Sequence, residues 1–558
     1  MPAAEREFHY VVVGAGSAGC TLARLLATGQ SRSVAVIEAG AAVSDVRSVV
    51  PNYYPRCFGS ALDWNFATVP QPQLGDRRIA WPRGKVVGGS GAINALIFML
   101  AADADFAAWG WPIPAASADP WPTTPYAANT AAANLAAANL AAADLSRGPL
   151  SSPHVWSEAF LEAATALGLE RQHTWKKASA NSCGYFQLTQ RHGRRCHAGH
   201  WLISEAAGEL SSLTLIPQAT VRRVILHQQR AVGVELRTSA GSLETIRATG
   251  EIILCGGAIG SPCLLQASGI GPAELLQAQG VRCVHPLPAV GENLQDHLVY
   301  PLIYQTHQAI GLPRRHSPAQ RQGYRQAGSG PLASNIAEAG GLVKFDDPPG
   351  ASPDACRPTD LQQPDFQIHF TPTHYLKYPR LPSGDHFLSL AVCDLHPRSR
   401  GRVRLAAAGG VGSSNEWNVH IDPHYLQAAD DGQRLLRAIA WTRQLAQQPG
   451  LREVIAGEAL PGPRRSDDRA VLRSVQAFAQ SIYHPVGTCR MQPVDAADGA
   501  DSVVDQAFRV HGLSGLRVVD ASVLPSLPSC NTNAVTLWLA AWASQKILGQ
   551  QMPAPHIL

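Results

Sequence analysis

The feature that most constrains this chain is a glycine-rich turn between two short apolar runs near the N-terminus. Residues 11–13 are a β-branched run that predicts one buried parallel strand, and the sequence G-x-G-x-x-G follows directly at residues 14–19. Residues 20–27 predict a helix and residues 34–37 a second strand, which ends at Glu38. A strand, a glycine turn, a helix, a strand and an acid in this order predict a βαβ unit that binds a dinucleotide.

The three glycines of the turn have distinct roles in such a unit. Gly14 permits the tight turn, Gly16 lets the backbone approach a pyrophosphate, and Gly19 lets helix and strand pack closely. The helix N-terminus presents unpaired N–H groups and the positive end of its dipole to the phosphates. Glu38 stands about 20 residues past the last glycine, where an acid binds the ribose, and it favours NAD or FAD over NADP. The unit alone leaves NAD and FAD open, and a structural unit without a ligand is the alternative.

Composition argues against several other kinds of protein. The chain has 558 residues, enough for two or more domains, and a net charge of +4 without a long basic run, which argues against nucleic acid as the main partner. Its 11 cysteines form no C-x-x-C pair, which suits reduced thiols in a cytoplasmic protein rather than a disulfide framework or a zinc site. The first residues lack the apolar core of a signal peptide, and no window of about 18 apolar residues predicts a transmembrane segment.

A second glycine-rich stretch, W-P-R-G-K-V-V-G-G-S-G-A-I-N, occupies residues 81–94. The small residues at 88–92 would let the backbone lie against a flat or anionic ligand. Residues 92–100 then predict a helix whose N-terminus faces the same ligand. The alternative for this composition is a flexible Gly/Ser loop.

With these two stretches the chain resembles the glucose–methanol–choline (GMC) family of FAD-dependent oxidoreductases. Residues 81–94 are similar to the first signature of that family, and residues 14–38 to its ADP-binding unit. The resemblance implies FAD rather than NAD, with residues 88–94 beside the pyrophosphate and the isoalloxazine. Some members attach FAD covalently through a histidine just before the asparagine. Here that position is Ile93, which implies a non-covalent flavin.

Further motifs extend the resemblance along the chain. Residues 252–272 predict another strand–glycine–helix junction, similar to the second family signature. The sequence V-G-E-N-L-Q-D-H at residues 290–297 is also family-like. Asp296 and His297 in this motif suggest acid–base work or, more commonly for neighbouring polar residues at a turn, binding to backbone groups.

The middle of the chain predicts a second unit. Between about residues 300 and 480, strands are predicted at 339–345, 365–370, 387–394 and 402–405, with an amphipathic helix at 430–447. These strands are expected to form an antiparallel sheet that faces the substrate.

Two other segments in the chain bear on the resemblance. Segments 330–341 and 394–401 resemble the branch of medium-chain alkanol and choline dehydrogenases. The alanine-rich tract at 127–145 departs from the family, and we expect a low-complexity helix or surface cover there.

The C-terminal segments resemble the catalytic region of the family. Residues 481–491 are similar to its catalytic-histidine motif, and Asn531 matches its second catalytic position, ahead of a predicted helix at 534–548. The resemblance assigns His484 as the base, and a histidine near its ordinary pKa of about 6.5 can accept a hydroxyl proton at neutral pH. The amide of Asn531 would hold the developing alkoxide without competing for that proton.

The expected fold class is α/β (α+β overall), with a Rossmann-like FAD-binding domain and a second substrate domain built on an antiparallel sheet with helices. Strands predicted at 213–216, 221–226 and 516–520 would belong to the first domain. The discontinuous FAD-binding domain is expected to combine residues 1–45, 81–100, 211–300 and 500–558, and the substrate domain with its covering segments residues 46–80, 101–210 and 301–499.

The motifs and the resemblance together give the expected site residues. The catalytic pair is His484 and Asn531, and no metal is expected. Val221 is either a backbone contact to the adenine side of FAD or a plain core valine. The residues expected at the flavin are Gly14, Gly16, Ser17, Ala18, Gly19, Glu38, Ala39, Arg83, Val87, Gly88, Gly89, Gly91, Asn94, Ala95, Val221, Asp520, Ala521, Asn531 and Asn533.

The expected reaction is FAD-dependent oxidation of a primary aliphatic alcohol to the aldehyde, with a quinone or oxygen as electron acceptor. Choline oxidation is an alternative, because Glu338 and nearby tyrosines could form the carboxylate and aromatic cage that a quaternary ammonium needs. Aryl-alcohol oxidation, hydroxynitrile cleavage and light-driven decarboxylation of fatty acids are further alternatives on the same scaffold. The expected location is cytoplasmic or peripheral at a membrane, and the oligomeric state stays open.

Overall fold

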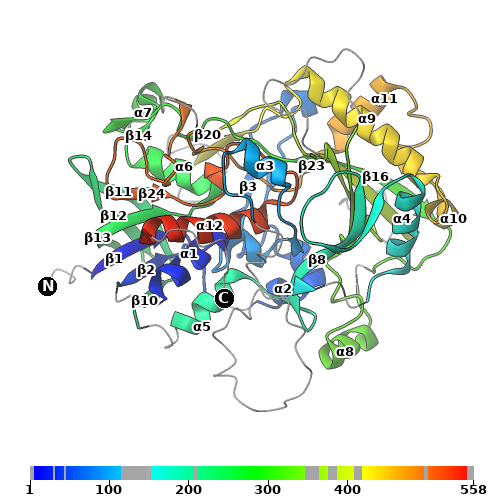
Figure 1. Cartoon of the computed structure of the whole chain (residues 1–558), viewed down its shortest axis with the longest axis horizontal. Helices are drawn as coiled ribbons and strands as arrows, with labels where there is room; N and C mark the ends of the chain where they lie inside the picture. Colours follow the sequence, from blue (N-terminus) through cyan, green and yellow to red (C-terminus); the bar gives the residue numbers. More distant parts are fainter. Residues whose placement is uncertain are drawn as a thin grey trace.

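Two large β-sheets organise the chain, with helices packed around them (Figure 1). The computed structural model describes residues 6–28, 32–42, 45–114, 147–148, 150, 152–206, 211–313, 315–345, 363–374, 386–406, 418–494 and 501–549. The alanine-rich tract at 127–145, where a low-complexity helix or surface cover was predicted, lies outside the described residues.

The first sheet has seven strands within the described ranges, in the order β10-β2-β1-β13-β12-β11, with β24 paired to β13. The strands are β1 (Arg6–Val13), β2 (Val34–Ile37), β10 (Leu213–Ile216), β11 (Ala219–His227), β12 (Arg230–Thr238), β13 (Leu243–Leu254) and β24 (Leu516–Val518). Strands β10, β2, β1, β13 and β24 are parallel, and β11 and β12 continue the sheet antiparallel. Val11 and Val12 are fully buried, as expected for a parallel strand covered on both faces.

Three helices begin beside the carboxyl ends of these parallel strands. Helix α1 (Ser17–Ala27) follows β1, and α6 (Gly257–Ala267) follows β13. Helix α12 (Thr532–Leu548) contacts α1 and lies beside it (Figure 1). Most side chains of α12 are buried, because its run of alanine, leucine and tryptophan is apolar on all sides. Ligands of open α/β sheets bind at the edge where such helices start.

The second sheet has eleven strands within the described ranges and lies on the other side of the molecule (Figure 1). Its main order is β22-β16-β19-β18-β17-β8-β5, and β23, β6, β7 and β9 pair at its margins. The strands are β5 (Ile97–Phe98), β6 (Arg147–Gly148), β7 (Glu170–Trp175), β8 (Ser182–Arg191), β9 (Arg194–Arg195), β16 (Leu298–Thr306), β17 (Ala339–Val343), β18 (Phe366–Thr371), β19 (Phe387–Asp394), β22 (Ile455–Leu460) and β23 (Gln480–Ser481). Pairing is antiparallel except between β7 and β8, so the predicted antiparallel sheet is confirmed.

Helices and short elements complete the described chain. Helices α4 (Val155–Ala166) and α9 (Ala429–Ala446) pack on the second sheet, and α11 (Asp468–Phe478) contacts α9. The other helices are α2 (Val46–Val49), α3 (Asp103–Ala108), α5 (Ala198–Ala206), α7 (Ala273–Ala278), α8 (Pro318–Ala327) and α10 (Leu451–Val454), and 3₁₀ turns span Pro51–Arg56, Pro72–Leu74, Gly89–Ala92 and Ala521–Val523. Two-stranded ribbons pair β3 (Phe66–Ala67) with β4 (Ala80–Trp81), β14 (Ile270–Gly271) with β15 (His285–Pro286), and β20 (Arg402–Leu405) with β21 (Val419–Asp422).

The helix predicted at residues 92–100 is wrong. A single 3₁₀ turn, Gly89–Ala92, is followed by Leu96 in the left-handed region at φ 62° and then by strand β5. The side chain of Asn94 accepts a hydrogen bond from the backbone N–H of Leu96 at 2.9 Å, which competes with helix formation. The chain therefore crosses to the second sheet within residues 81–100.

The strand predicted at 402–405 was expected in the large antiparallel sheet. It forms as β20 but pairs with β21 in a separate two-stranded ribbon, so its predicted place is wrong.

None of the helices in the described residues is long and apolar enough to cross a membrane. The same residues contain no cluster of three or more His, Cys, Asp or Glu side chains suited to a metal ion.

Candidate active site

One cavity of about 340 Å³ is lined by residues from both sheets. Its lining includes sixteen of the predicted site residues: Gly14, Gly16, Ser17, Ala18, Glu38, Ala39, Arg83, Gly89, Asn94, Ala95, Val221, His484, Asp520, Ala521, Asn531 and Asn533. The cavity joins segments that are far apart in the chain. The hydroxyl of Ser17 donates to Oδ1 of Asn533, 516 residues away, at 2.7 Å.

The glycine turn after β1 has the geometry that its sequence predicts. Gly14 lies at φ 103°, and a Cβ built on Gly19 would lie 1.9 Å from the carbonyl oxygen of Gly14. A Cβ on Gly16 would meet no atom within 4 Å, because this residue faces the cavity. Gly16 also stands at the N-cap of α1 without a side chain to bind the first-turn N–H groups. That end of α1 is therefore open to an anionic ligand.

Glu38 closes the other side of this turn. Its Oε2 accepts a hydrogen bond from the N–H of Ala15 at 2.9 Å, and its Oε1 accepts from Gly40 at 2.8 Å. The carboxyl group is almost fully buried, and burial raises its pKa to about 7 against the opposing effect of these two N–H donors. Its position at the end of β2 is the one where a ribose diol is bound in dinucleotide folds.

The second glycine-rich loop lies directly on the first. The N–H of Gly88 donates to the carbonyl of Ala15 at 2.7 Å, and a Cβ on Gly89 would lie 2.7 Å from Cα of Gly16. Four of the residues predicted at the flavin are absent from the cavity lining: Gly19, Val87, Gly88 and Gly91. In the protein without ligand these four pack the loops against one another, and their contact with the flavin stays a prediction. Val87, for example, is buried in the hydrophobic core.

Arg195 holds the second loop from behind, a role that the sequence did not indicate. Its guanidinium donates to Oδ1 of Asn94 at 2.6 Å, to the Asn94 carbonyl at 2.5 Å and to the carbonyls of Gly91 and Ser48. Burial lowers its pKa to about 10. These acceptors are neutral, and they fix the asparagine that borders the cavity.

Asp520 organises the edge of the cavity at the start of α6. Its Oδ2 accepts from the N–H of Gly257 at 2.9 Å and from the hydroxyl of Ser261 at 2.5 Å, and its Oδ1 accepts from Ser522 at 2.8 Å. This buried carboxyl group follows β24, so the C-terminal strand of the first sheet positions it.

His484 and Asn531 meet in the cavity although they are 47 residues apart. Nδ2 of Asn531 lies 3.3 Å from Nε2 of His484. Asn531 is the N-cap residue of α12, and His484 follows β23 in a turn that projects its ring beside that helix end. Burial lowers the pKa of His484 well below 6.5, and the nearby His297, His369 and Arg83 lower it further.

Asp296 fixes the backbone of this turn. Its carboxylate accepts the N–H of His484 at 2.7 Å, the hydroxyl of Ser481 at 2.5 Å and the hydroxyl of Tyr425. The prediction that this residue binds backbone at a turn is confirmed. His297, its neighbour, instead places Nδ1 2.9 Å from Nδ1 of His484.

Two further polar residues surround the pair, and sequence reasoning missed both. Gln367 donates from Nε2 to Oδ1 of Asn531 at 3.3 Å. His369 lines the cavity, hydrogen-bonds Asn531 and is 7% exposed, and its Nδ1 has no partner among the described residues. Both stand on β18, and the two-residue period of a strand puts them on one face. That period is visible in the sequence, but the sequence does not indicate which face meets the catalytic pair.

Much of the remaining lining is apolar. Ile97, Ala337, Ala391 and Ile482 line the same cavity, and the aromatic residues Tyr54, Phe58, Trp64, Phe66 and Tyr483 contribute further apolar surface. The cavity therefore combines an anion-accepting end at the glycine turn with a largely apolar end that contains His484, His369 and the amide of Asn531.

The residues of this cavity fit a flavin dinucleotide. The space in front of Gly16 and the uncapped start of α1 suit a pyrophosphate, and the buried carboxylate of Glu38 suits a ribose diol. The start of α12 faces the cavity at Thr532 and Asn533, where a helix dipole favours negative charge.

Comparison with known protein families agrees with this geometry. Family models described as GMC oxidoreductase match residues 8–299 and 397–540. The chain belongs to the GMC oxidoreductase family, so the recognition made from the motifs is confirmed. FAD as the cofactor and a flavin-dependent oxidoreductase as the class of enzyme are confirmed with it.

Individual relatives cover almost the whole chain. It is 32% identical over 556 residues to an alcohol dehydrogenase [acceptor] from Pseudomonas putida. The alignment covers 97% of this chain and 96% of that relative. It is also 32% identical to oxygen-dependent choline dehydrogenase 1 from Chromohalobacter salexigens, with 99% and 96% covered. Among solved structures, pyridoxine 4-oxidase from Mesorbium loti has a TM-score of 0.82 and 27% identity, over 98% of this chain and 100% of that one.

Proposed function

We propose that this protein oxidises an uncharged, primary aliphatic alcohol to the aldehyde. The observation that carries the proposal is the approach of the Asn531 amide to Nε2 of His484 in an apolar part of the cavity. A base and a hydrogen-bond donor at one point are what an alcohol needs to lose its hydroxyl proton.

In this proposal His484 accepts the hydroxyl proton at Nε2, and the lowered pKa keeps its ring neutral at neutral pH. Asn531 donates from Nδ2 to the alcohol oxygen as negative charge develops there. Bound FAD would supply the acceptor for the hydride that leaves the alcohol carbon. The apolar lining excludes water and orients the carbon chain of the substrate.

The residues proposed to hold FAD are those of the cavity lining. Gly16 and the start of α1 would bind the pyrophosphate, Glu38 the ribose, and Val221 with its neighbours Ala219 and Thr220 the adenine side. Ile93 lines the cavity where some family members carry the histidine that attaches FAD, so the flavin is proposed to be non-covalent.

Two observations favour an uncharged alcohol over choline. Glu338, the carboxylate considered for a quaternary ammonium, accepts hydrogen bonds from Ser157, Ser334 and the N–H of His154 and is absent from the cavity lining. The carboxylates among the described lining residues are Glu38 and Asp520, and both bind backbone N–H groups away from His484. A quaternary ammonium therefore finds no unengaged carboxylate in the described part of the cavity.

The test uses the FAD-loaded protein under anaerobic conditions. Medium-chain primary alkanols, benzyl alcohol and choline are mixed with it, and loss of the oxidised flavin absorbance is followed. The alkanols should bleach the flavin fastest, and a preference for choline would contradict the proposal. Repeating the turnover assay with oxygen and with a quinone dye identifies the acceptor.

Two variants test whether His484 is the general base of the reaction. His484→Ala should lower turnover by about 10²–10⁴-fold while FAD stays bound, because the general base is lost. His227→Ala is the matched control, since His227 is exposed at the end of β11. An active His484→Ala variant would remove the base from the proposal.

A further inference from the structure

His297, which follows Asp296 in the family-like motif at residues 290–297, lies against His484, the proposed base. The rings of His297 and His484 have centroids 5.1 Å apart and are nearly perpendicular, at 76°. Their two Nδ1 atoms are 2.9 Å apart, so one of the two nitrogens carries the shared proton and the other accepts it. Which one carries it decides whether Nε2 of His484 can act as a base.

The opposite side of His297 settles the direction of this bond. Its Nε2 lies 3.2 Å from the carbonyl oxygen of Leu395, which can only accept, so Nε2 carries a proton. His297 is fully buried, and burial lowers its pKa to about 3, which keeps the ring neutral. A neutral ring that is protonated at Nε2 has a bare Nδ1. His484 must therefore donate from its own Nδ1, and its Nε2 is bare.

The cavity side of His484 agrees with this direction. Nδ2 of Asn531, a donor, lies 3.3 Å from the bare Nε2. The amide is held in that orientation because its Oδ1 accepts from Nε2 of Gln367 at 3.3 Å. Gln367, Asn531, His484 and His297 thus form a chain of four hydrogen bonds in which every donor points toward Leu395.

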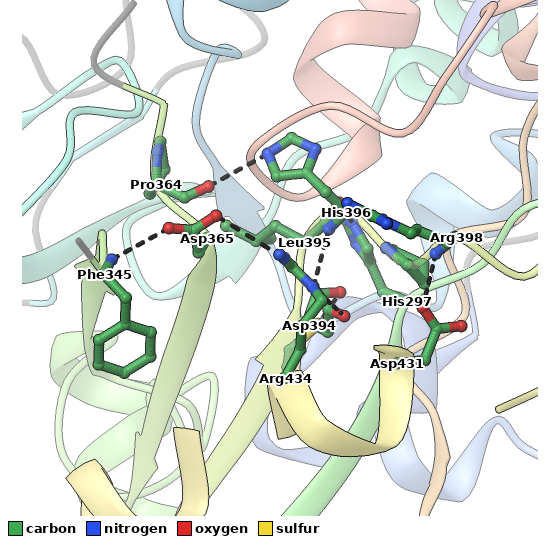
Figure 2. Close-up of polar contacts among 12 residues, drawn as sticks. His297, Phe345, Pro364, Asp365, Asp394, Leu395, His396, Arg398, Asp431 and Arg434 are labelled. Carbon is green, nitrogen blue, oxygen red and sulfur yellow. Dashed lines mark hydrogen bonds and ion pairs between the residues drawn. The ribbon is translucent and has the colours of Figure 1, made fainter. Parts of the chain in front are cut away.

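The Leu395 carbonyl, which ends this series of hydrogen bonds, is held in place by its neighbours. Figure 2 shows Asp394, Leu395 and His396 in succession at the end of β19, with Arg434 of α9 reaching toward Asp394. Arg434 pairs with the Asp394 carboxylate at 2.8 Å, and the same carboxylate accepts the N–H of His396 at 3.0 Å. The N–H of Leu395 itself donates to the carbonyl of Asp365 at 3.0 Å.

We propose that His297 is a positioning residue that holds His484 in the tautomer with a proton on Nδ1 and a bare Nε2 facing the cavity. The inference deepens the proposed alcohol oxidation and rests on it for its catalytic consequence. When the alcohol O–H bond breaks and an N–H bond forms at Nε2, the new imidazolium keeps its Nδ1–H bond to His297. No proton is relayed beyond His297, because its Nε2 already carries a proton and the Leu395 carbonyl can only accept a hydrogen bond.

The other charged and titratable groups near the pair do not replace this role. Asp296 uses its carboxylate on the backbone N–H of His484, on Ser481 and on Tyr425, and leaves the ring free. Arg83 and His369 disfavour a positive charge on His484. The orienting partner of the base is therefore a neutral imidazole rather than a carboxylate.

Two substitutions of similar size separate positioning from space filling. In His297→Gln, the amide can accept from Nδ1–H of His484 and donate to the Leu395 carbonyl, whereas the side chain of His297→Leu can do neither. With FAD loaded, the leucine variant should lose about 10–100-fold in kcat while KM changes by less than about threefold, and the glutamine variant should stay within about fivefold of the wild type. Wild-type turnover in His297→Leu, or equal losses in both folded, FAD-loaded variants, would overturn the assignment.

A direct readout does not depend on alcohol turnover. Neutron diffraction from deuterium-exchanged crystals of the resting, FAD-loaded protein shows which ring nitrogens carry a deuteron. The expected positions are Nδ1 of His484 and Nε2 of His297, and a deuteron on Nε2 of His484 would refute the proposal. If no alcohol bleaches the wild-type flavin, the proposed function fails while this measurement still decides the tautomer.

Discussion

The carboxylate of Glu38 lies 2.9 Å from the backbone nitrogen of Ala15, so the acid at the end of β2 closes back onto the glycine turn after β1. The same carboxylate accepts from Gly40 on its other oxygen. Because this acid is buried and bound to the turn proposed to hold the pyrophosphate, its protonation should be coupled to the binding of FAD.

FAD affinity should therefore depend on pH. Burial raises the pKa of Glu38 to about 7 in the protein without ligand, and ribose hydroxyls donate best to the ionised carboxylate. Binding then releases a proton, so the affinity should rise as pH increases from about 5 to 7 and level off above that. Titrating the apoprotein with FAD by flavin fluorescence at a series of pH values measures this. Glu38→Gln should bind FAD more weakly and without this dependence, and an unchanged pH profile would exclude Glu38 as its source.

The stability of the apoprotein should change with pH in the opposite sense. A carboxyl group whose folded pKa is about 7, against 4.5 for the ordinary group, holds its proton more tightly in the folded state. This contribution to stability is therefore present below about 4.5 and is lost as pH rises to about 7. Comparing melting temperatures of the apoprotein and its Glu38→Gln variant across this range isolates the contribution, because the variant should lack it.

Two glycines of the same turn should respond differently to alanine. Gly16→Ala places its Cβ in open space, so the apoprotein should keep its melting temperature, while FAD affinity should fall by about tenfold or more because the methyl group occupies the pyrophosphate approach. Gly19→Ala places its Cβ 1.9 Å from the Gly14 carbonyl oxygen, which should destabilise the fold by about 2–4 kcal/mol. Equal effects of both variants on apoprotein stability would contradict this division.

The pH profile of kcat/KM should report a weak base. Burial and the neighbouring His297, His369 and Arg83 lower the pKa of His484 below 6.5, so its neutral form persists through the physiological range. We expect kcat/KM for an alkanol to be flat above pH 6.5 and to fall only on the acid side. Steady-state assays between pH 5 and 9 test this, and a limb with an apparent pKa above about 7 would show that another group controls the reaction.

Asn531 should be needed as a donor and not merely for its volume. Asn531→Ala removes the amide, and Asn531→Asp replaces it with a carboxylate that accepts only and repels a developing alkoxide. Both should lower kcat by about 10²–10³-fold, with the aspartate variant at least as slow. Flavin absorbance confirms that each variant is loaded. Wild-type turnover in Asn531→Asp would mean that the amide is not a donor in the reaction.

The pair formed by Arg434 and Asp394 should contribute far more to stability than a comparable pair at the surface. Asp394 is 4% exposed and would be left without its cation in Arg434→Met, which should cost about 2–4 kcal/mol and lower kcat by displacing Leu395. Arg398→Ala is the control, since Arg398 pairs with Asp430 at an exposed site and its loss should cost less than about 1 kcal/mol. Chemical denaturation measures both, and equal costs would contradict the difference in burial.

Local sequence determines much of what was predicted correctly. The turn after β1 needs glycines at three positions for steric reasons, and strands such as Val34–Ile37 and Phe387–Asp394 match their apolar runs residue for residue. The predicted helix after residue 92 failed because its outcome depends on Arg195, which binds Asn94 from a distant part of the chain. Propensity cannot include such a tertiary partner.

In the candidate site, too, motifs predicted some residues correctly, whereas others depend on tertiary contacts. Gly16, Glu38, His484 and Asn531 line the cavity as expected, because motifs with fixed spacing carry them. Gly88 and Val87 belong to such a motif and yet lie behind the surface, since a motif preserves packing residues together with those that face a ligand. Gln367 reaches Asn531 from 164 residues away, His369 also bonds Asn531, and His297 reaches His484 from 187 residues away. Local patterns do not encode such contacts.

The insertion of β24 beside β13 has a consequence for biosynthesis. The N-terminal unit with the phosphate-binding turn emerges first from the ribosome, but its sheet is incomplete until residues 516–518 have been translated. Asn533, which binds Ser17, comes later still. The turn is thus translated long before the strand and the helix that complete its surroundings, so binding of the coenzyme should follow the folding of these later segments.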